Sequence, residues 1–177
     1  MGASTASAAR LFLALWPPPR VRQALHAIQT QWLWPEGAAL VDPARLHVTL
    51  HFLGQVPLAR IDEFTRGLAV PCEPHVLDLA QARNTRWPGG LAVLEFDATP
   101  ELARLHAALA QALRSLDCPV EARAYRPHVT FARRAFGARP PADAPATLPS
   151  WRIDDGYVLV RSVPGRGYEV LHAYRPA

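Results

Sequence analysis

Two short segments, far apart in the chain, each place a histidine and a threonine two residues apart. His47 and Thr49 lie in RLHVTLHFLG, and His128 and Thr130 lie in YRPHVTFARR. Both segments have the pattern of strands, so each histidine shares a strand face with its threonine, and the intervening valine lies on the other face. Along a strand such a pair is roughly 6.6 Å apart, which lets the imidazole and the hydroxyl reach one bound group.

Two imidazoles and two hydroxyls, without a carboxylate or a thiol, suit the hydrolysis or transesterification of a phosphodiester. One imidazole can take a proton from the attacking oxygen while the other gives a proton to the leaving oxygen. The ordinary histidine pKa of ~6.5 allows one neutral and one protonated ring near neutral pH. The threonine hydroxyls can donate hydrogen bonds to the non-bridging phosphate oxygens. This chemistry requires neither a metal nor another cofactor.

A single His-x-Thr segment is usually only a partly exposed strand, so the inference depends on finding two in matching positions. Strict alternation also places His51 on the face of His47 and Thr49. A metal site formed by His47 and His51 remains an alternative, although no carboxylate or thiol on that strand face would complete the ligand set.

The composition is that of an ordinary globular chain. Of its 177 residues, 50% are hydrophobic and 19% are charged, the net charge is +4, and all 19 basic residues are arginine. An arginine excess suits an anionic partner such as a phosphate or a nucleic acid, although a bias in genomic base composition is the commoner cause of a missing lysine. The two cysteines have no metal-binding spacing, and no apolar run approaches the ~20 residues of a membrane span. We expect a cytoplasmic protein without a membrane segment.

The elements that must position the histidines follow from hydrophobic periodicity and from proline. The patterns predict strands at 11–16, 45–54, 75–82, 91–97, 127–133, 156–163 and 168–174, and helices at 19–34, 57–70 and 100–116. The last two strands form a hairpin. The segments 83–90 and 139–149, the second rich in proline, are expected to be loops.

The order of these elements repeats as strand, proline-led helix and His-x-Thr strand. We therefore predict a duplicated α+β unit at approximately 10–80 and 90–163, whose two copies pack face to face with the His-x-Thr strands lining the groove between them. Residues 1–9 are expected to form a disordered tail, and residues 10–177 a single bilobal domain that is monomeric.

The two motifs resemble the paired HxTx motifs of the 2H phosphoesterase superfamily, and the whole chain resembles the RNA 2′,3′-cyclic phosphodiesterases, also called 2′-5′ RNA ligase-like proteins. The matching segments are HVTLHFLG and RPHVTFAR. The similarity includes the opening strand and helix, the residues leading into His47, the helix before the second motif and the closing hairpin. It covers nearly the whole chain apart from the tail and the proline-rich loop.

This resemblance implies an α+β fold of two pseudo-symmetric lobes, each an antiparallel sheet with helices on its outer side, enclosing a central groove. It also implies metal-independent hydrolysis of the 2′,3′-cyclic phosphate at an RNA end to a 2′-phosphomonoester, so that the bond to O3′ breaks. By the same resemblance His47 would be the proton donor and His128 the proton acceptor, with Thr49 and Thr130 binding the phosphate.

Two arginines are candidate phosphate ligands. Arg133 matches an arginine that often follows the second motif, but strict alternation places it away from the His128 face unless the strand ends or bulges at Ala132. Arg126 shares the His128 face and is a rival ligand. Either residue could equally be an ordinary surface arginine.

Two further residues are candidates for RNA binding. His51 would line the groove near an RNA phosphate. Trp87 lies in the arginine-containing segment 83–90 and could stack a base, whereas the commoner role of such a tryptophan is to cover the core.

Several functions fit this pattern. The leading one acts on RNA ends that bear a 2′,3′-cyclic phosphate or on related nucleotides, and the reverse reaction would join ends through a 2′-5′ bond at the same site. A non-catalytic RNA-end-binding module is a second class, although such a module would not need both histidines. A 2H phosphodiesterase for a small cyclic nucleotide is a third, and the basic balance weakly favours a polymer over it.

Overall fold

The computed structural model describes residues 8–142 and 148–176. Its elements are β1 (Ala8–Leu15), α1 (Pro19–Thr30), β2 (Ala39–Leu40), η1 (Pro43–Arg45), β3 (Val48–Pro57), η2 (Leu58–Arg60), α2 (Ile61–Gly67), β4 (His75–Asp78), η3 (Leu79–Gln81), β5 (Arg83–Trp87), β6 (Leu91–Glu95), α3 (Pro100–Ser115), β7 (His128–Arg133), β8 (Ser150–Ile153), β9 (Tyr157–Val163) and β10 (Gly167–Tyr174), where η marks a 3₁₀ turn. None of the described helices has the length and apolar character that crossing a membrane would require.

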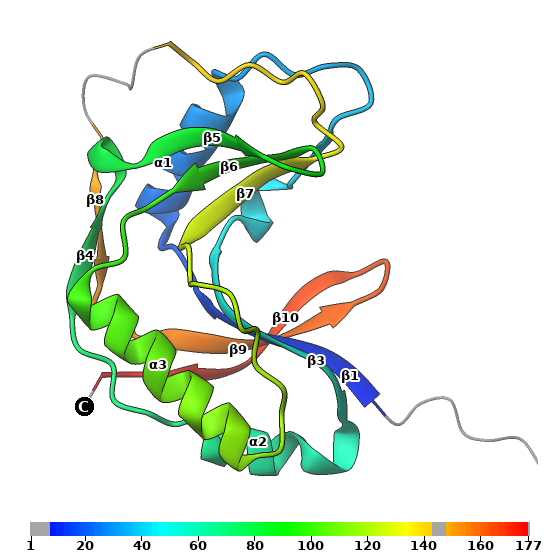
Figure 1. The fold of residues 1–177 in the computed structure, drawn as a ribbon, viewed down its shortest axis with the longest axis vertical. Coiled ribbons are helices and arrows are strands. Elements are labelled where there is room, and N and C mark those ends of the chain that lie inside the picture. Colours follow the sequence, from blue (N-terminus) through cyan, green and yellow to red (C-terminus); the bar gives the residue numbers. More distant parts are fainter. Residues whose placement is uncertain (1–7, 143–147, 177) are drawn as a thin grey trace, which may run out of the picture.

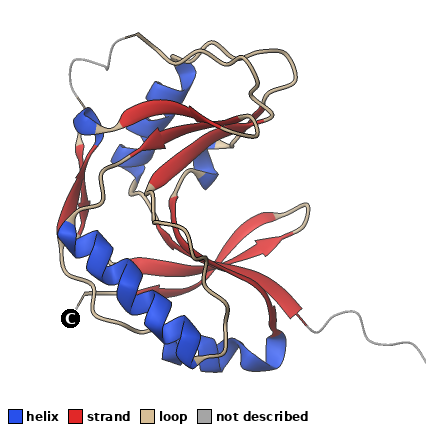
Figure 2. Ribbon diagram, viewed as in Figure 1, coloured by secondary structure: helices blue, strands red, loops and turns tan. Residues whose placement is uncertain are grey.

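Most strands belong to one antiparallel sheet that divides into two lobes (Figures 1 and 2). The strand order is β10-β9-β1-β3-β7-β6-β5, with β2 also paired to β7. We call β10, β9, β1 and β3 the first lobe, and β7, β6, β5 and β2 the second lobe. The α+β architecture, with antiparallel lobes and helices on their outer sides, is the one predicted from the sequence.

The two lobes are joined where β3 meets β7. In the described part of the chain the only residue pair between these strands is Val48 with Val129. Both valines are fully buried, and burial of each side chain contributes about 1.5–3 kcal/mol to folding. From this junction the lobes diverge, so that β2, rather than β3, pairs with Ala132 and Arg133 at the other end of β7.

Each lobe is covered by a helix from the other part of the chain. The helix α1 follows β1 but packs on β7, where the buried Gln29 amide donates to the carbonyl oxygens of Phe131 and Val41, both at 2.9 Å. The helix α3 follows β6 but lies against β3, where the carbonyl oxygen of His106 accepts from Nε2 of His51 at 2.9 Å. The lobes therefore do not coincide with the two halves of the chain.

The helices form where proline and apolar spacing predict them. Both α1 and α3 have proline in the first turn, where the missing N–H costs nothing. The hydroxyl oxygen of Thr99 caps α3 by accepting from the Leu102 amide at 3.2 Å. The buried residues at helical spacing are Val21, Leu25 and Ile28 in α1 and Leu102, Leu105, Leu109 and Leu113 in α3. One cluster of buried residues extends through both lobes.

Several local predictions are wrong. The segment 83–90 is not simply a loop, because Arg83–Trp87 forms the edge strand β5 paired with β6. Its polar side chains hid the strand, since an edge strand buries little. The tail prediction fails for Ala8 and Ala9, which belong to β1; residues 1–7 lie outside the described residues. In the predicted loop 139–149, residues 143–147 also lie outside them, and the short strand β8 begins directly afterwards.

Candidate active site

The two His-x-Thr pairs meet at the junction of the lobes. Val48 and Val129 pair with buried side chains, so the residues on either side of them project from the opposite face of each strand. Because the strands are antiparallel, His47 lies on the Thr130 side of this pair and Thr49 on the His128 side. We call the faces that carry these four side chains the inner faces of the lobes.

The two imidazoles are held in the same way. Nδ1 of His47 lies 2.6 Å from the carbonyl oxygen of Arg45, and Nδ1 of His128 lies 2.7 Å from the carbonyl oxygen of Arg126. A carbonyl oxygen only accepts, so each Nδ1 carries the hydrogen and each neutral ring leaves Nε2 unprotonated. Nε2 is therefore the atom of each ring that can exchange a proton with a bound group.

His47 stands among aromatic rings of the first lobe. Its ring stacks on Phe12 at 5.0 Å and on Trp16 at 5.6 Å between centroids, and Tyr168 approaches edge-on at 5.5 Å. Its Nε2 lies 3.0 Å from the hydroxyl oxygen of Thr49, which donates to it in the neutral ring. These contacts fix the orientation of the ring and leave little freedom for its Nε2 atom.

Arg22 is a site residue that sequence analysis missed. Its guanidinium donates to the carbonyl oxygens of Pro17, Pro43 and Leu46 at 3.0–3.3 Å, and it lies 5.4 Å from the centroid of the Trp16 ring. It thereby ties the end of β1 to the residues that lead into His47. Nothing in the sequence marks it, because its partners are backbone atoms of segments distant in the chain.

The side chains around His128, in the second lobe, are more polar than the aromatic rings around His47. Its ring centroid lies 4.3 Å from that of Trp87, whose Nε1 donates to Glu95 at 3.2 Å. Arg126 lies over Trp87 at 4.4 Å and forms two hydrogen bonds with the Glu95 carboxylate, at 2.8 and 2.9 Å. Trp87 therefore packs beside His128 on the inner face and does not cover the core. Glu95, buried and paired with His128 across the strands, was also not predicted.

Burial lowers the pKa of both histidines in the free protein. Burial, as the largest cause, and the positive charges of Arg133, His128 and Arg22 together lower the pKa of His47 to about 4, against the opposing effect of the Arg45 carbonyl. Burial also lowers the pKa of His128, but the Arg126 carbonyl and the Glu95 carboxylate oppose that shift. The surroundings of His47 thus disfavour a positive charge, whereas those of His128 include a carboxylate that stabilises one.

The structure does not bring His51 to this site. The register between β1 and β3 shifts after Thr49, which pairs with Ala14 while His51 pairs with Leu13. This bulge reverses the alternation, so His51 turns to the outer side and stacks on His106 at 4.0 Å. The prediction that His51 lines the groove is therefore wrong, and a metal site shared by His47 and His51 is excluded by their opposite directions.

A second bulge places Arg133 on the inner face. Thr130 pairs with Val93 and Ala132 with Ala92, so Phe131 is the extra residue on β7 and strict alternation fails after it. Arg133 is exposed, and its charge acts on His47. From the sequence, Arg133 could share the His128 face only if the strand ended or bulged at Ala132, and the structure has a bulge directly before that residue. Arg126 is instead engaged by Glu95.

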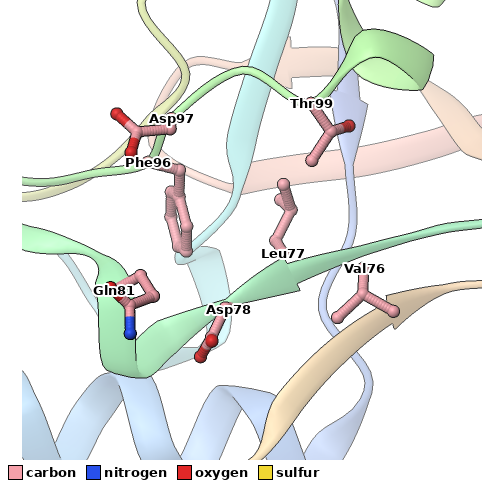
Figure 3. Close-up of a pocket in the computed structure, with 7 residues that line it drawn as sticks. All are labelled: Val76, Leu77, Asp78, Gln81, Phe96, Asp97 and Thr99. Carbon is pink, nitrogen blue, oxygen red and sulfur yellow. The ribbon is translucent and has the colours of Figure 1, made fainter.

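No group of three or more histidine, cysteine, aspartate or glutamate side chains that could hold a metal occurs among the described residues. A cavity of about 230 Å³ lies elsewhere in the fold, beside β4 (Figure 3), and none of the predicted site residues lines it. Its lining residues are Val76, Leu77, Asp78, Gln81, Phe96, Asp97 and Thr99. This cavity therefore contains neither of the two motif histidines.

Comparison with known proteins identifies the family. A model described as the 2′-5′ RNA ligase superfamily matches residues 17–162. This chain belongs to the 2′-5′ RNA ligase superfamily. A relative from Thermus thermophilus, named RNA 2′,3′-cyclic phosphodiesterase, is 30% identical over 189 residues, which cover 93% of this chain and 89% of the relative. The resemblance found in the sequence is thus confirmed at the level of the superfamily.

Solved structures of similar proteins share the fold. Escherichia coli LigT complexed with 3′-AMP has a TM-score of 0.76 at 25% identity, over 96% of this chain and 99% of LigT. The structure of TT0787 from Thermus thermophilus has a TM-score of 0.70 at 27% identity, over 94% of this chain and 97% of that one. The superfamily fold therefore extends over nearly the whole chain.

We predict that the imidazole of His47 stays neutral at pH values well below the ordinary histidine pKa. Its pKa of about 4 in the folded protein lies below the ordinary value of 6.5, so lowering the pH from 7 to 5 should leave the ring neutral. An anion bound beside it should raise this pKa, because a negative charge favours the imidazolium. Titration of the imidazole nitrogens by NMR, with and without inorganic phosphate, measures both values.

The His47→Gln variant assigns the resonance in that titration. The resonances of exposed His172 in the same spectra serve as the internal control and should not move when phosphate is added at fixed pH. A free-protein pKa at or above 6.5 for His47, or no upward shift with phosphate, would contradict the geometry described here.

Proposed function

We propose that this protein hydrolyses the 2′,3′-cyclic phosphodiester ends of RNA to 2′-phosphomonoesters by metal-independent general acid–base catalysis. The observation that carries the proposal is the meeting of two His-Thr pairs at the Val48–Val129 junction, each imidazole anchored through Nδ1 to a carbonyl. The name of the Thermus thermophilus relative, at 30% identity, supports the same activity.

In the proposed reaction a water oxygen attacks phosphorus as the bond from phosphorus to O3′ breaks. Nε2 of His128 accepts the proton that the water loses, and Nε2–H of His47 gives its proton to O3′. The hydroxyls of Thr49 and Thr130 donate hydrogen bonds to the non-bridging oxygens, where negative charge accumulates. Each turnover leaves His128 protonated and His47 neutral, and exchange with solvent restores the starting state.

The charges around the two rings support this direction of proton transfer. Glu95 stabilises the imidazolium that forms when His128 accepts a proton. The cations beside His47 make its imidazolium a stronger acid, which favours donation to an alkoxide leaving group. The cost is that His47 is seldom protonated in the free protein, so the bound phosphate anion must raise its pKa before it can act as the donor.

Of the two candidate phosphate arginines, Arg133 has the better support, because its exposed side chain acts on His47 from the inner face. Arg126 is held by Glu95 and lies on Trp87, an arrangement that suits orienting the second lobe beside His128. Base stacking by Trp87 stays a prediction, since two of its neighbours already contact its ring.

Other functions would use the same residues. With a 5′-hydroxyl oxygen in place of water, the site would form a 2′-5′ phosphodiester and so join RNA ends. A small cyclic nucleotide could replace an RNA end as substrate, and a non-catalytic binding module would keep the inner faces without acid–base chemistry. The anchored Nδ1 atoms favour catalysis over binding alone, because binding does not require a defined proton at Nε2.

We predict that replacing either histidine removes general acid or base catalysis. With an oligoribonucleotide ending in a 2′,3′-cyclic phosphate and EDTA present, the wild-type protein should form the 2′-phosphate. His47→Ala and His128→Ala should each lower kcat by at least ~100-fold, the usual contribution of a positioned acid or base. Chromatography of the products measures both the rate and the position of the phosphate.

His172→Ala is the matched control, since His172 is exposed on β10, and it should retain the wild-type rate. Loss of wild-type activity in EDTA, or a near-normal rate for either motif variant, would contradict the proposed mechanism. A binding module would show no turnover at all.

A substrate with a better leaving group distinguishes the two roles. The nitrophenolate released from bis(p-nitrophenyl) phosphate needs little protonation, so loss of the general acid should matter less. We expect His47→Ala to be at least ~10-fold less damaging with this ester than with the cyclic phosphate, and His128→Ala to be equally damaging with both. The opposite pattern would reverse the assigned roles.

A further inference from the structure

The inner face of the first lobe continues well beyond His47 with side chains that the proposed mechanism does not use. Phe52 is 55% exposed although it belongs to a central strand. Phe52 lies 6.3 Å from Phe12, and Phe12 lies 5.0 Å from Tyr168, between ring centroids. Arg45 lies 5.8 Å from the centroid of Tyr168. An aromatic surface bordered by arginine thus extends away from the histidines.

Strand register places this surface on the face of the catalytic pairs. On β1 the alternation against β9 is regular, so Arg10 faces the same way as Phe12 and Ala14. The bulge that turns His51 outward brings Phe52 inward, where it pairs with Phe12, and Gln55 then pairs with Arg10. On β10, Tyr168 pairs with Ser162 of β9, which in turn pairs with Arg10.

The charged side chains of β1, β3, β9 and β10 on this inner face are positive. Within 8–16, 47–57 and 157–174 the only acidic residue is Glu169. Glu169 pairs with Arg161, which pairs with the buried Leu11, so it faces the outer side. On the inner face Arg10 is therefore not opposed by a carboxylate from these strands, and an open cavity of about 430 Å³ adjoins it.

The surface is long enough for more than the terminal nucleotide. Ala14 pairs with Thr49 at the phosphate site, and Arg10 lies four residues further along β1, a distance of about 13 Å at ~3.3 Å per residue. A stacked strand advances ~3.4 Å per nucleotide and an extended single strand advances more, so this span fits about two to four nucleotides.

We propose that the inner face of β1, β3 and β10 binds the single-stranded RNA segment that precedes the cyclic end, with Phe52 stacking a base and Arg10 contacting a backbone phosphate. This inference rests on the proposed function for the position of the terminal phosphate. Exposed aromatic rings combined with cations are the usual means of holding single-stranded nucleic acid without sequence preference. The substrate is then an RNA end, and a mononucleotide is only its minimal form.

The kinetic test compares uridine 2′,3′-cyclic phosphate with a hexaribonucleotide that ends in the same group. The wild-type protein should show at least ~10-fold higher kcat/KM for the hexanucleotide. Phe52→Ala should lower the ratio of the two kcat/KM values by at least ~5-fold, as expected for a lost base stack. Arg10→Gln should lower this ratio by about 3-fold, as expected for one exposed ionic contact.

Two matched variants control for general effects. Arg66→Gln removes one exposed positive charge from α2, and Phe136→Ala removes a phenylalanine that is 68% exposed in the second lobe. Both should leave the ratio unchanged. An unchanged ratio in Phe52→Ala and Arg10→Gln, or equal use of both substrates by the wild-type protein, would overturn the proposed RNA surface while leaving the phosphodiesterase activity in place.

A binding measurement tests the same surface without turnover. Fluorescence anisotropy of a labelled hexaribonucleotide ending in a 2′-phosphate gives the dissociation constant at several salt concentrations. Arg10→Gln should reduce the slope of log affinity against log salt by about 0.7, the value for one phosphate contact on a single strand. Arg66→Gln should keep the wild-type slope. Equal slopes for the wild-type protein and Arg10→Gln would overturn the phosphate contact even if the protein hydrolysed no cyclic phosphate.

Discussion

The site depends on the single backbone pairing between Val48 and Val129. These two valines join the lobes, and their burial turns the neighbouring histidines and threonines to the inner faces. Because one residue pair links the strands before they diverge, the four side chains are brought together while the rest of β3 and β7 separates. The helices also connect the two lobes. The helix α1, from the first half of the chain, packs on β7 of the second lobe, and α3, from the second half, packs on β3 of the first lobe.

The two imidazoles are alike in orientation and different in electrostatics. Each gives its Nδ1 hydrogen to the carbonyl two residues earlier, so the proton chemistry is confined to Nε2 in both. His47, however, is packed among aromatic rings and near arginines, whereas His128 has a carboxylate close by. In the proposed mechanism an acid and a base are thus built from one residue type and one motif by changing only the neighbours, and the negative charge of a phosphate would complete the balance around His47.

The sequence was sufficient to predict the fold class, the helices and the face shared by each His-Thr pair, because these follow from periodicity and proline. It failed for His51, whose direction depends on a bulge that has no local signature, and the same effect decided the position of Arg133. The edge strand β5 was missed because its side chains are mostly polar. Arg22 was missed because its hydrogen-bond partners are all backbone atoms of segments distant in the chain. Alternation is reliable over two residues and unreliable across a bulge, so the motif pairs were predicted better than the residues around them.

The most direct measurement of the central claim is a crystal structure of the protein with a 2′-phosphorylated ribonucleotide. The account predicts one phosphate at the Val48–Val129 junction, with Nε2 of His47 and of His128 on opposite sides of it and the hydroxyls of Thr49 and Thr130 within hydrogen-bond distance of its oxygens. A phosphate bound away from this junction, or contacted by only one of the two imidazoles, would contradict it.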